Sequence, residues 1–122
     1  MGKTVISPKA VKVEDITSQI TFAGGITLQS GGVYKYGKLV CVQIRVYSDT
    51  VTIQAGTQII TGGLPTPAGL TGGNSNVAFH CNRLGLSPYY TSNYNGISIL
   101  QLSTETVQTG NAVYICGIYL SE

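Results

Sequence analysis

Short runs of alternating apolar and polar residues, separated by glycine-rich turns, fill most of this chain. The clearest run covers residues 39–47. Successive side chains of a strand point to opposite faces, so this run has one aliphatic face and one mixed face. The aliphatic face carries Val40, Val42, Ile44 and Val46, and the mixed face carries Cys41, Gln43, Arg45 and Tyr47. We therefore expect a strand whose aliphatic face lies in the core.

Further strands are expected wherever β-branched residues lie between turn signals. They are residues 16–22, 26–29, 33–36, 51–54, 58–61, 76–82, 97–102 and 112–120. Spacings of about 8–12 residues between strands are typical of sandwiches and jelly rolls. The pattern therefore predicts an all-β fold, an antiparallel β-sandwich or jelly roll.

Two segments need separate treatment. Val13, Ile16 and Ile20 have the spacing of a helix face, but Thr17 and its neighbours are weak helix formers, so a strand is favoured over residues 16–22. Residues 62–70 contain two prolines, which remove hydrogen-bond donors from a sheet. We expect these residues to form an ordered loop across one end of the fold.

Composition limits the class of protein. The chain has 122 residues, of which 43% are hydrophobic and 10% charged, and this excludes a disordered chain. Residues 1–15 include most of the lysines and Pro8 and are interpreted as a leader or linker to a shaft. Residues 16–122 are interpreted as a single β-sandwich head domain.

Charge is scarce as well as nearly balanced. Seven basic and five acidic residues leave a formal net charge of +2 without a basic stripe, so nucleic acid is not an expected partner. No apolar run approaches the ~20 residues that span a bilayer, so membrane insertion is not expected. The surface of a free domain usually carries about 25–35% charged residues. We therefore expect other subunits to cover part of this surface.

The residue types used in catalysis and metal binding are present without a diagnostic arrangement. The cysteines, Cys41, Cys81 and Cys116, are odd in number and widely spaced, which argues against a disulfide framework and favours a reducing cytosol. A zinc site made by these cysteines and His80 is disfavoured, because zinc ligands usually come in close pairs. Since all three cysteines lie in predicted strands, core packing is the favoured interpretation.

The sequence favours neither a cysteine–histidine pair nor a carboxylate pair as a catalytic arrangement. His80 and Cys81 are adjacent on one strand, so their side chains point to opposite faces and cannot form a nucleophilic pair. The acids inside the chain are Glu14, Asp15, Asp49 and Glu105, which lie in the leader or at predicted turns. A carboxylate pair for glycoside hydrolysis is therefore disfavoured. We expect a non-enzymatic protein without metal or cofactor.

A polar aromatic segment at residues 87–96 is the strongest candidate for binding. Tyrosine offers a large contact area at low entropic cost, while asparagine and serine add adaptable hydrogen bonds. Aromatic faces cover the C–H groups of sugars and amides reach their hydroxyls, so we expect saccharide contacts from Tyr89, Tyr90, Asn93, Tyr94 and Asn95. The alternative is a hairpin loop whose tyrosines cap the fold or fill a subunit contact.

The end of a neighbouring strand extends this candidate site. His80 and Asn82 alternate there with Cys81, and Arg83 follows them. We expect His80, Asn82 and Arg83 to continue the saccharide site that the aromatic segment begins.

Three segments together resemble a family. Residues 34–42 (YKYGKLVCV) follow the pattern Tyr-Lys-x-Gly-x-Val-Val-x-Val, and residues 111–122 (NAVYICGIYLSE) end the chain with an aliphatic and aromatic strand. Residues 64–68 (LPTPA) match a Leu-Pro-x-Gly-Tyr-Arg-Pro loop only in part, since they lack the aromatic residue and the arginine. The chain resembles the C-terminal head domains of tailed-phage minor structural and tail-fibre proteins.

This resemblance implies a β-sandwich or jelly roll that forms a homotrimer at the tip of a phage or prophage tail. It further implies a place in the virion, contacts with other tail or fibre subunits, and attachment to saccharide on the host cell surface. The family has no residue pattern that transfers position by position, so the candidate site depends on the loop composition alone. A trimeric knob that binds no ligand is the alternative function, and a tail-borne depolymerase is disfavoured by the scarcity of paired acids.

Overall fold

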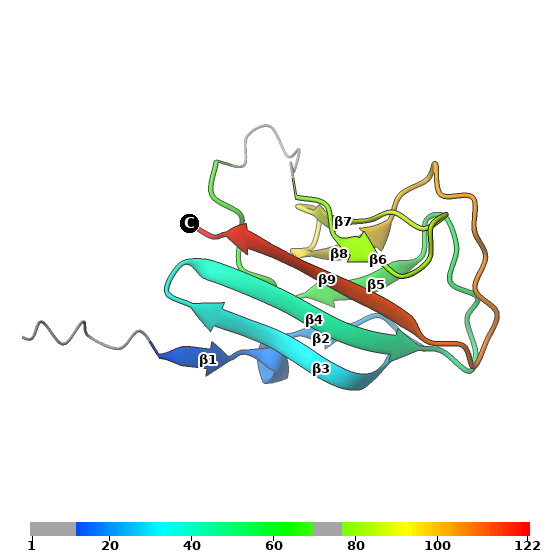
Figure 1. The fold of residues 1–122 in the computed structure, drawn as a ribbon, viewed down its shortest axis with the longest axis horizontal. Helices are drawn as coiled ribbons and strands as arrows, with labels where there is room; N and C mark the ends of the chain where they lie inside the picture. The colour runs from blue at the N-terminus through cyan, green and yellow to red at the C-terminus, as the bar shows by residue number, and fades with distance from the viewer. Residues whose placement is uncertain (1–11, 70–76) are drawn as a thin grey trace, which may run out of the picture.

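Two antiparallel β-sheets face each other in the computed structural model, which describes residues 12–69 and 77–122 (Figure 1). A five-stranded sheet has the order β1-β3-β4-β9-β6, and a four-stranded sheet has the order β2-β5-β8-β7. The strands of the first sheet are β1 (Val13–Asp15), β3 (Thr27–Tyr36), β4 (Leu39–Tyr47), β6 (His80–Cys81) and β9 (Val113–Leu120). Those of the second are β2 (Thr21–Phe22), β5 (Gln58–Gly62), β7 (Pro88–Thr91) and β8 (Gly96–Ile99). The predicted all-β, antiparallel sandwich is confirmed.

The centre of the five-stranded sheet follows the alternation of the sequence. Strand β4 has the predicted bounds, and its aliphatic set, Val40, Val42, Ile44 and Val46, is buried. Strand β4 pairs with β3 on one side and with β9 on the other. On β9, Val113 and Ile115 continue the same buried face. The opposite face of this sheet points to solvent.

The four-stranded sheet supplies the other half of the core. Its largest fully buried side chains belong to Ile59 and Ile60 on β5, Tyr90 on β7, and Ile97 and Ile99 on β8. Burial of each aliphatic side chain of this size stabilises the folded state by about 1.5–3 kcal/mol. The core is therefore made almost entirely of aliphatic side chains, with tyrosine at one end.

At both edges of the sandwich the chain changes from one sheet to the other. Strand β1 pairs with β3, and after a short 3-10 helix, η1 (Thr17–Gln19), the chain pairs with β5 as β2. At the other edge, the backbone N–H of Phe79 donates to Pro88 on β7, and the next two residues pair with β9 as β6. These crossings leave only short edge strands, which limits pairing with other chains.

Local hydrogen bonds explain why residues 16–22 are not one strand, as expected. The backbone N–H of Thr17 donates to Asp15 Oδ1 at 2.9 Å, and the Thr17 hydroxyl accepts the N–H of Val33 at 2.9 Å. Threonine side chains that bond to backbone in this way stabilise turns. They hold η1 against β3, and Ile16 and Ile20 on either side of it are buried.

Glycine explains a second difference, because the two strands expected at 26–29 and 33–36 form the single strand β3. The β3–β4 pairing has a register shift between Leu28 and Ser30, and Gly31 follows with a φ of 84°. A Cβ at Gly31 would overlap the carbonyl oxygen of Gln43. Glycine tolerates both the left-handed conformation and the close approach, so the ladder continues through a segment that its composition marks as a turn.

Other predicted boundaries were shifted. Residues 51–54 form only an isolated bridge from Ile53 to Val107, and β8 ends at Ile99 instead of continuing to residue 102. Of residues 77–82, only β6 is a strand, with a bridge from Ala78 to Tyr89 before it, and residue 76 lies outside the described residues. The predicted loop at 62–70 contains a bridge from Pro67 to Ser121, and residue 70 lies outside the described residues.

The boundary predicted at residue 15 does not coincide with the edge of the sandwich. Val13, Glu14 and Asp15 belong to β1 and pair with Tyr36, Lys35 and Tyr34 of β3. The end of the predicted leader is therefore part of the five-stranded sheet. Residues 1–11 lie outside the described residues.

Gly96 at the start of β8 provides a test of the close contact between β8 and β5. A Cβ there would overlap the carbonyl oxygen of Ile60. We expect Gly96→Ala to lower the free energy of unfolding by about 1–3 kcal/mol, the range for overpacked sites, as measured by urea denaturation. Gly24→Ala is the control, because a Cβ at Gly24 meets no atom within 4 Å. Equal stability of the two variants would contradict the packing described here.

Candidate functional site

Of the saccharide-binding residues predicted around the β7–β8 hairpin, one belongs to the hydrophobic core. Tyr90 is fully buried, so its predicted role as a saccharide contact is wrong. Its ring centroid lies 6.2 Å from that of Tyr119, and its hydroxyl donates to Asn95 Oδ1. Burial raises the pKa of the Tyr90 hydroxyl. The alternation of β7 turns this tyrosine inward, whereas Tyr89 beside it is half-buried.

Asn95 serves the turn itself. It has a φ of 52°, in the left-handed region that asparagine tolerates better than most residues. Its carbonyl accepts the N–H of Leu64, and its side chain accepts the Tyr90 hydroxyl. Asn93 is exposed and Tyr94 half-buried at the tip of the same hairpin. The hairpin thus keeps Tyr89, Asn93, Tyr94 and Asn95 accessible, although Asn95 also stabilises the turn, while Tyr90 is buried.

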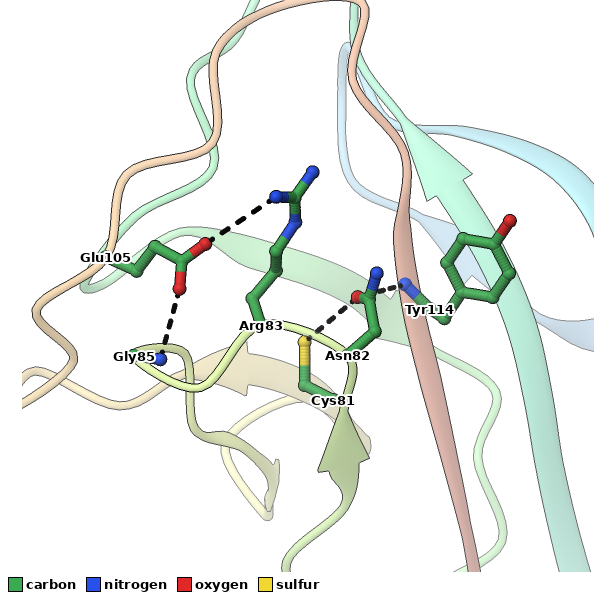
Figure 2. Close-up of polar contacts among 6 residues, drawn as sticks. All are labelled: Cys81, Asn82, Arg83, Gly85, Glu105 and Tyr114. Atoms are coloured by element: carbon green, nitrogen blue, oxygen red, sulfur yellow. Dashed lines mark hydrogen bonds and ion pairs between the residues drawn. The ribbon is translucent and has the colours of Figure 1, made fainter.

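Asn82 and Arg83 lie in the turn after β6 and hold it in place (Figure 2). Asn82 Oδ1 accepts the backbone N–H of Tyr114 at 3.0 Å, and the N–H of Asn82 donates to the carbonyl of Tyr114 at 3.2 Å. Arg83 Nη1 lies 3.8 Å from Glu105 Oε2, and Glu105 Oε1 accepts the N–H of Gly85 at 3.2 Å. Such a half-exposed ion pair contributes about 1 kcal/mol or less. Both side chains therefore have structural partners.

Asn82 and Arg83 lie apart from the tip of the β7–β8 hairpin. Asn82 contacts β9 at Tyr114, whereas Tyr90 of the hairpin contacts β9 at Tyr119. Five residues of strand correspond to about 17 Å, and β9 exposes Tyr114 but buries Tyr119. Asn82 and Arg83 therefore do not extend the site at the hairpin tip as predicted, whereas His80 lies two residues from Ala78, which bridges to Tyr89.

The burial of each cysteine depends on which face of its strand it occupies. His80 is exposed and Cys81 buried, which confirms that the two side chains point to opposite faces. Burial raises the pKa of the Cys81 thiol. Core packing was also expected for Cys41 and Cys116, but Cys41 is half-buried and Cys116 exposed, because both lie on the outer face of the five-stranded sheet. All three thiols are free.

The acids and possible metal ligands do not converge. Hydrogen bonding from Thr17 lowers the pKa of Asp15, and the side chain of Thr17 contributes more to this effect than its backbone. Glu105 pairs with Arg83. Among residues 12–69 and 77–122, no group of three or more His, Cys, Asp or Glu side chains is placed to hold a metal ion.

A hollow on the outer face of the five-stranded sheet is a candidate binding site that the sequence did not reveal. Its volume is about 350 Å³. Strands β3, β4 and β9 line it with Ser30, Gly31, Gln43, Ile44, Arg45, Tyr114, Ile115 and Cys116. It lies where the β3–β4 register shifts and where Gly31 has no side chain. We call it the Arg45 hollow.

Arg45 and Tyr114 form one wall of the Arg45 hollow. They are register partners on β4 and β9, and Arg45 Cζ lies 4.9 Å from the centroid of the Tyr114 ring. Gln43 on β4 is paired with Cys116 on β9, which is itself paired with His80 on β6. A cation, an aromatic ring, an amide and a thiol therefore lie on one sheet face. These groups suit noncovalent recognition of a polar ligand.

A row of exposed apolar side chains crosses the same face toward its other end. Cα pairing places Val13 beside Tyr36, Tyr36 beside Leu39, and Leu39 beside Leu120, across β1, β3, β4 and β9. Their exposed fractions are 64%, 49%, 38% and 62%, and Ile118 next to the row is 64% exposed. We call these four residues the apolar row. Monomers rarely expose contiguous apolar surface of more than a few hundred Å², so the row marks a surface suited to a partner.

The fold defines the class of the molecule as an antiparallel β-sandwich, and both surfaces lie on the outer face of its five-stranded sheet. Comparisons with known proteins add no narrower class, because no protein-family model, curated protein or solved structure matches the chain. Within the described residues, no helix has the length and apolar character needed to cross a membrane.

The buried hydroxyl of Tyr119, beneath the loop at residues 62–69, should make the stability of the fold depend on pH. Burial raises the pKa of its hydroxyl well above the usual value, and the hydroxyl donates to the Pro65 carbonyl at 2.7 Å. A raised pKa stabilises the folded state fully below the unfolded pKa of about 10, and this contribution is lost as pH rises further. We expect the free energy of unfolding from urea denaturation to fall between pH 9 and pH 11.

Tyr119→Phe should reduce this fall. The variant also loses the hydrogen bond to Pro65, so at pH 8 it should be less stable by about 1 kcal/mol. Cys81 remains in both proteins and cannot cause the difference between them. An identical loss of stability between pH 9 and pH 11 in wild type and variant would show that Tyr119 does not titrate in this way.

Proposed function

We propose that this chain is a non-enzymatic receptor-binding head domain of a tailed-phage or prophage tail fibre, which attaches to saccharide on the host cell surface. The Arg45 hollow is the proposed saccharide site. The single observation that carries the proposal is this concavity on an exposed sheet face, lined by Arg45, Gln43 and Tyr114. The motif at residues 34–42 and the aromatic C-terminal strand support the phage part of the proposal.

The chemistry of the Arg45 hollow suits a sugar. A volume of about 350 Å³ is at the small end of ligand pockets, which suits one sugar residue of a chain that continues over the sheet face. The Gln43 side chain is both donor and acceptor, as sugar hydroxyls are. Tyr114 is 47% exposed, so part of its ring remains available to the C–H groups of a sugar. No bond needs to be broken for this binding, which fits a non-enzymatic role.

Variants of the Arg45 hollow and of the hairpin test where the saccharide binds. On a glycan array of host polysaccharides, we expect wild type to bind, and Gln43→Ala and Tyr114→Ala to weaken binding by about tenfold or more, as loss of a good polar or aromatic contact does. Tyr94→Ala at the hairpin is the control and should bind as wild type does. The reverse pattern would assign the site to the hairpin, and absence of binding to any glycan would contradict the proposed function.

The apolar row favours a second function, that of a trimeric structural knob of a fibre. The row lies on a face with few charges, in a chain with only 10% charged residues. Packing of this face against other copies would remove four large apolar side chains from water. This role requires no ligand, and it is also compatible with saccharide binding at the other end of the same face.

Light scattering tests the oligomer directly. We expect wild type at micromolar concentration to have three times the monomer mass of 12.8 kDa, and Leu120→Lys to shift the protein toward monomer because a charge would enter the apolar row. Leu84→Lys is the matched control, since Leu84 is fully exposed in the turn after β6. A wild-type mass near 12.8 kDa would refute the subunit interface.

A further inference from the structure

Arg45 has a charge that no acidic group of the described chain neutralises. Among residues 12–69 and 77–122, the ion pair within 4.0 Å joins Arg83 to Glu105 and does not involve Arg45. Arg45 Nε is shielded from solvent and has no hydrogen-bond partner. The lining of the Arg45 hollow contains no carboxylate. The guanidinium is thus held at a concave surface without an acidic partner.

We propose that the Arg45 hollow selects saccharides that carry an oxyanion, either a carboxylate or a phosphate, over neutral sugars. This inference depends on the proposed saccharide-binding function and names the chemical class of its ligand. It narrows the proposed ligand from saccharides in general to acidic saccharides. A single unpaired arginine decides the ligand class here, even though the chain as a whole has few charges.

The stacking of Arg45 on Tyr114 prepares the guanidinium for this role. The distance of 4.9 Å from Cζ to the ring centroid is within the range of cation–π contacts, which restrict the motion of the side chain. A guanidinium presents parallel N–H groups that match the two oxygens of a carboxylate or phosphate. Because Arg45 is already ordered and has no internal acid to release, an incoming oxyanion meets a preorganised partner.

The neighbours of Arg45 add polar contacts without opposing charge. Ser30 is its register partner on β3, and Gln43 lies two residues away on the same face of β4. Both side chains line the Arg45 hollow and can bond to the hydroxyls of the sugar that carries the oxyanion. Free phosphate would engage only the arginine, so the sugar ring should add affinity.

Titration calorimetry of the full chain with small ligands tests the inference. The probes are glucuronate and glucose 6-phosphate as acidic sugars, glucose as the neutral sugar, and inorganic phosphate as the anion alone. We expect either acidic sugar to bind at least tenfold more tightly than glucose and than phosphate, and this preference to weaken when salt is raised from 50 to 500 mM. The acidic sugar that binds more tightly identifies carboxylate or phosphate as the natural group.

Arginine variants locate the effect. Arg45→Gln should abolish the preference for acidic sugars, and Arg45→Lys should retain only part of it, because lysine keeps the charge but lacks the paired N–H groups. Arg83→Gln is the matched control, since Arg83 pairs with Glu105, and it should bind as wild type does. The comparison of ligands on wild type stands by itself if a variant does not fold.

The outcomes separate the two proposals. Equal affinity of wild type for glucose and the acidic sugars, or an unchanged preference in Arg45→Gln, would overturn the oxyanion inference and leave saccharide binding intact. Phosphate binding as tight as glucose 6-phosphate would also overturn it, because the site would then recognise an anion without its sugar. Absence of binding to every sugar, both in titration calorimetry and on the glycan array, would overturn the proposed function itself.

A labelling readout places the ligand without relying on affinity. Cys116 lines the Arg45 hollow and is exposed, while Cys81 is buried. Bound acidic sugar should slow maleimide labelling of Cys116, as followed by mass spectrometry. Unchanged labelling under saturating ligand would show that the sugar binds elsewhere and would overturn the inference.

Discussion

The antiparallel ladder between β4 and β9 is the constraint on which the rest of the structure depends. Its register alternates buried aliphatic pairs, such as Ile44 with Ile115, with outward pairs, such as Arg45 with Tyr114. A slip of one residue would place the aliphatic side chains in water and the arginine in the core. The hydrophobic core thus fixes the same register that brings Arg45 and Tyr114 together. The pairing of Arg45 with Tyr114 on the outer face is a consequence of packing on the inner face.

At two places the chain crosses between the sheets, and these crossings cover the edges of the five-stranded sheet that contains the β4–β9 ladder. The chain leaves the five-stranded sheet after β1 through η1, where Thr17 bonds to Val33, and it returns to that sheet through β6, where Cys81 is buried. Because short segments bridge both edges, the broad exposed surface left to the five-stranded sheet is its outer face. That face combines the apolar row with the Arg45 hollow, which suits a domain that contacts other copies and a ligand at once.

Residue composition alone does not separate the binding residues of the predicted saccharide site from its structural residues. The segment at residues 87–96 has the residue types of a recognition loop, yet Tyr90 fills the core and Asn95 stabilises a tight turn. The same residue types serve both purposes, since tyrosine has a large apolar ring and asparagine tolerates left-handed backbone. Strand alternation within the segment was a usable signal, because it separates Tyr90 from Tyr89. The turn chemistry of Asn95 was a second signal.

The sequence was sufficient to predict the sheet class, the bounds of β4 and which of its faces is buried, because the alternation of aliphatic residues is a local property of the chain. It also determined that His80 and Cys81 point apart. The contact of Arg45 with Tyr114 and the row formed by Val13, Tyr36, Leu39 and Leu120 follow only from the folded arrangement of the strands. These groupings join strands far apart in the chain, and their register follows from the packing of the whole core.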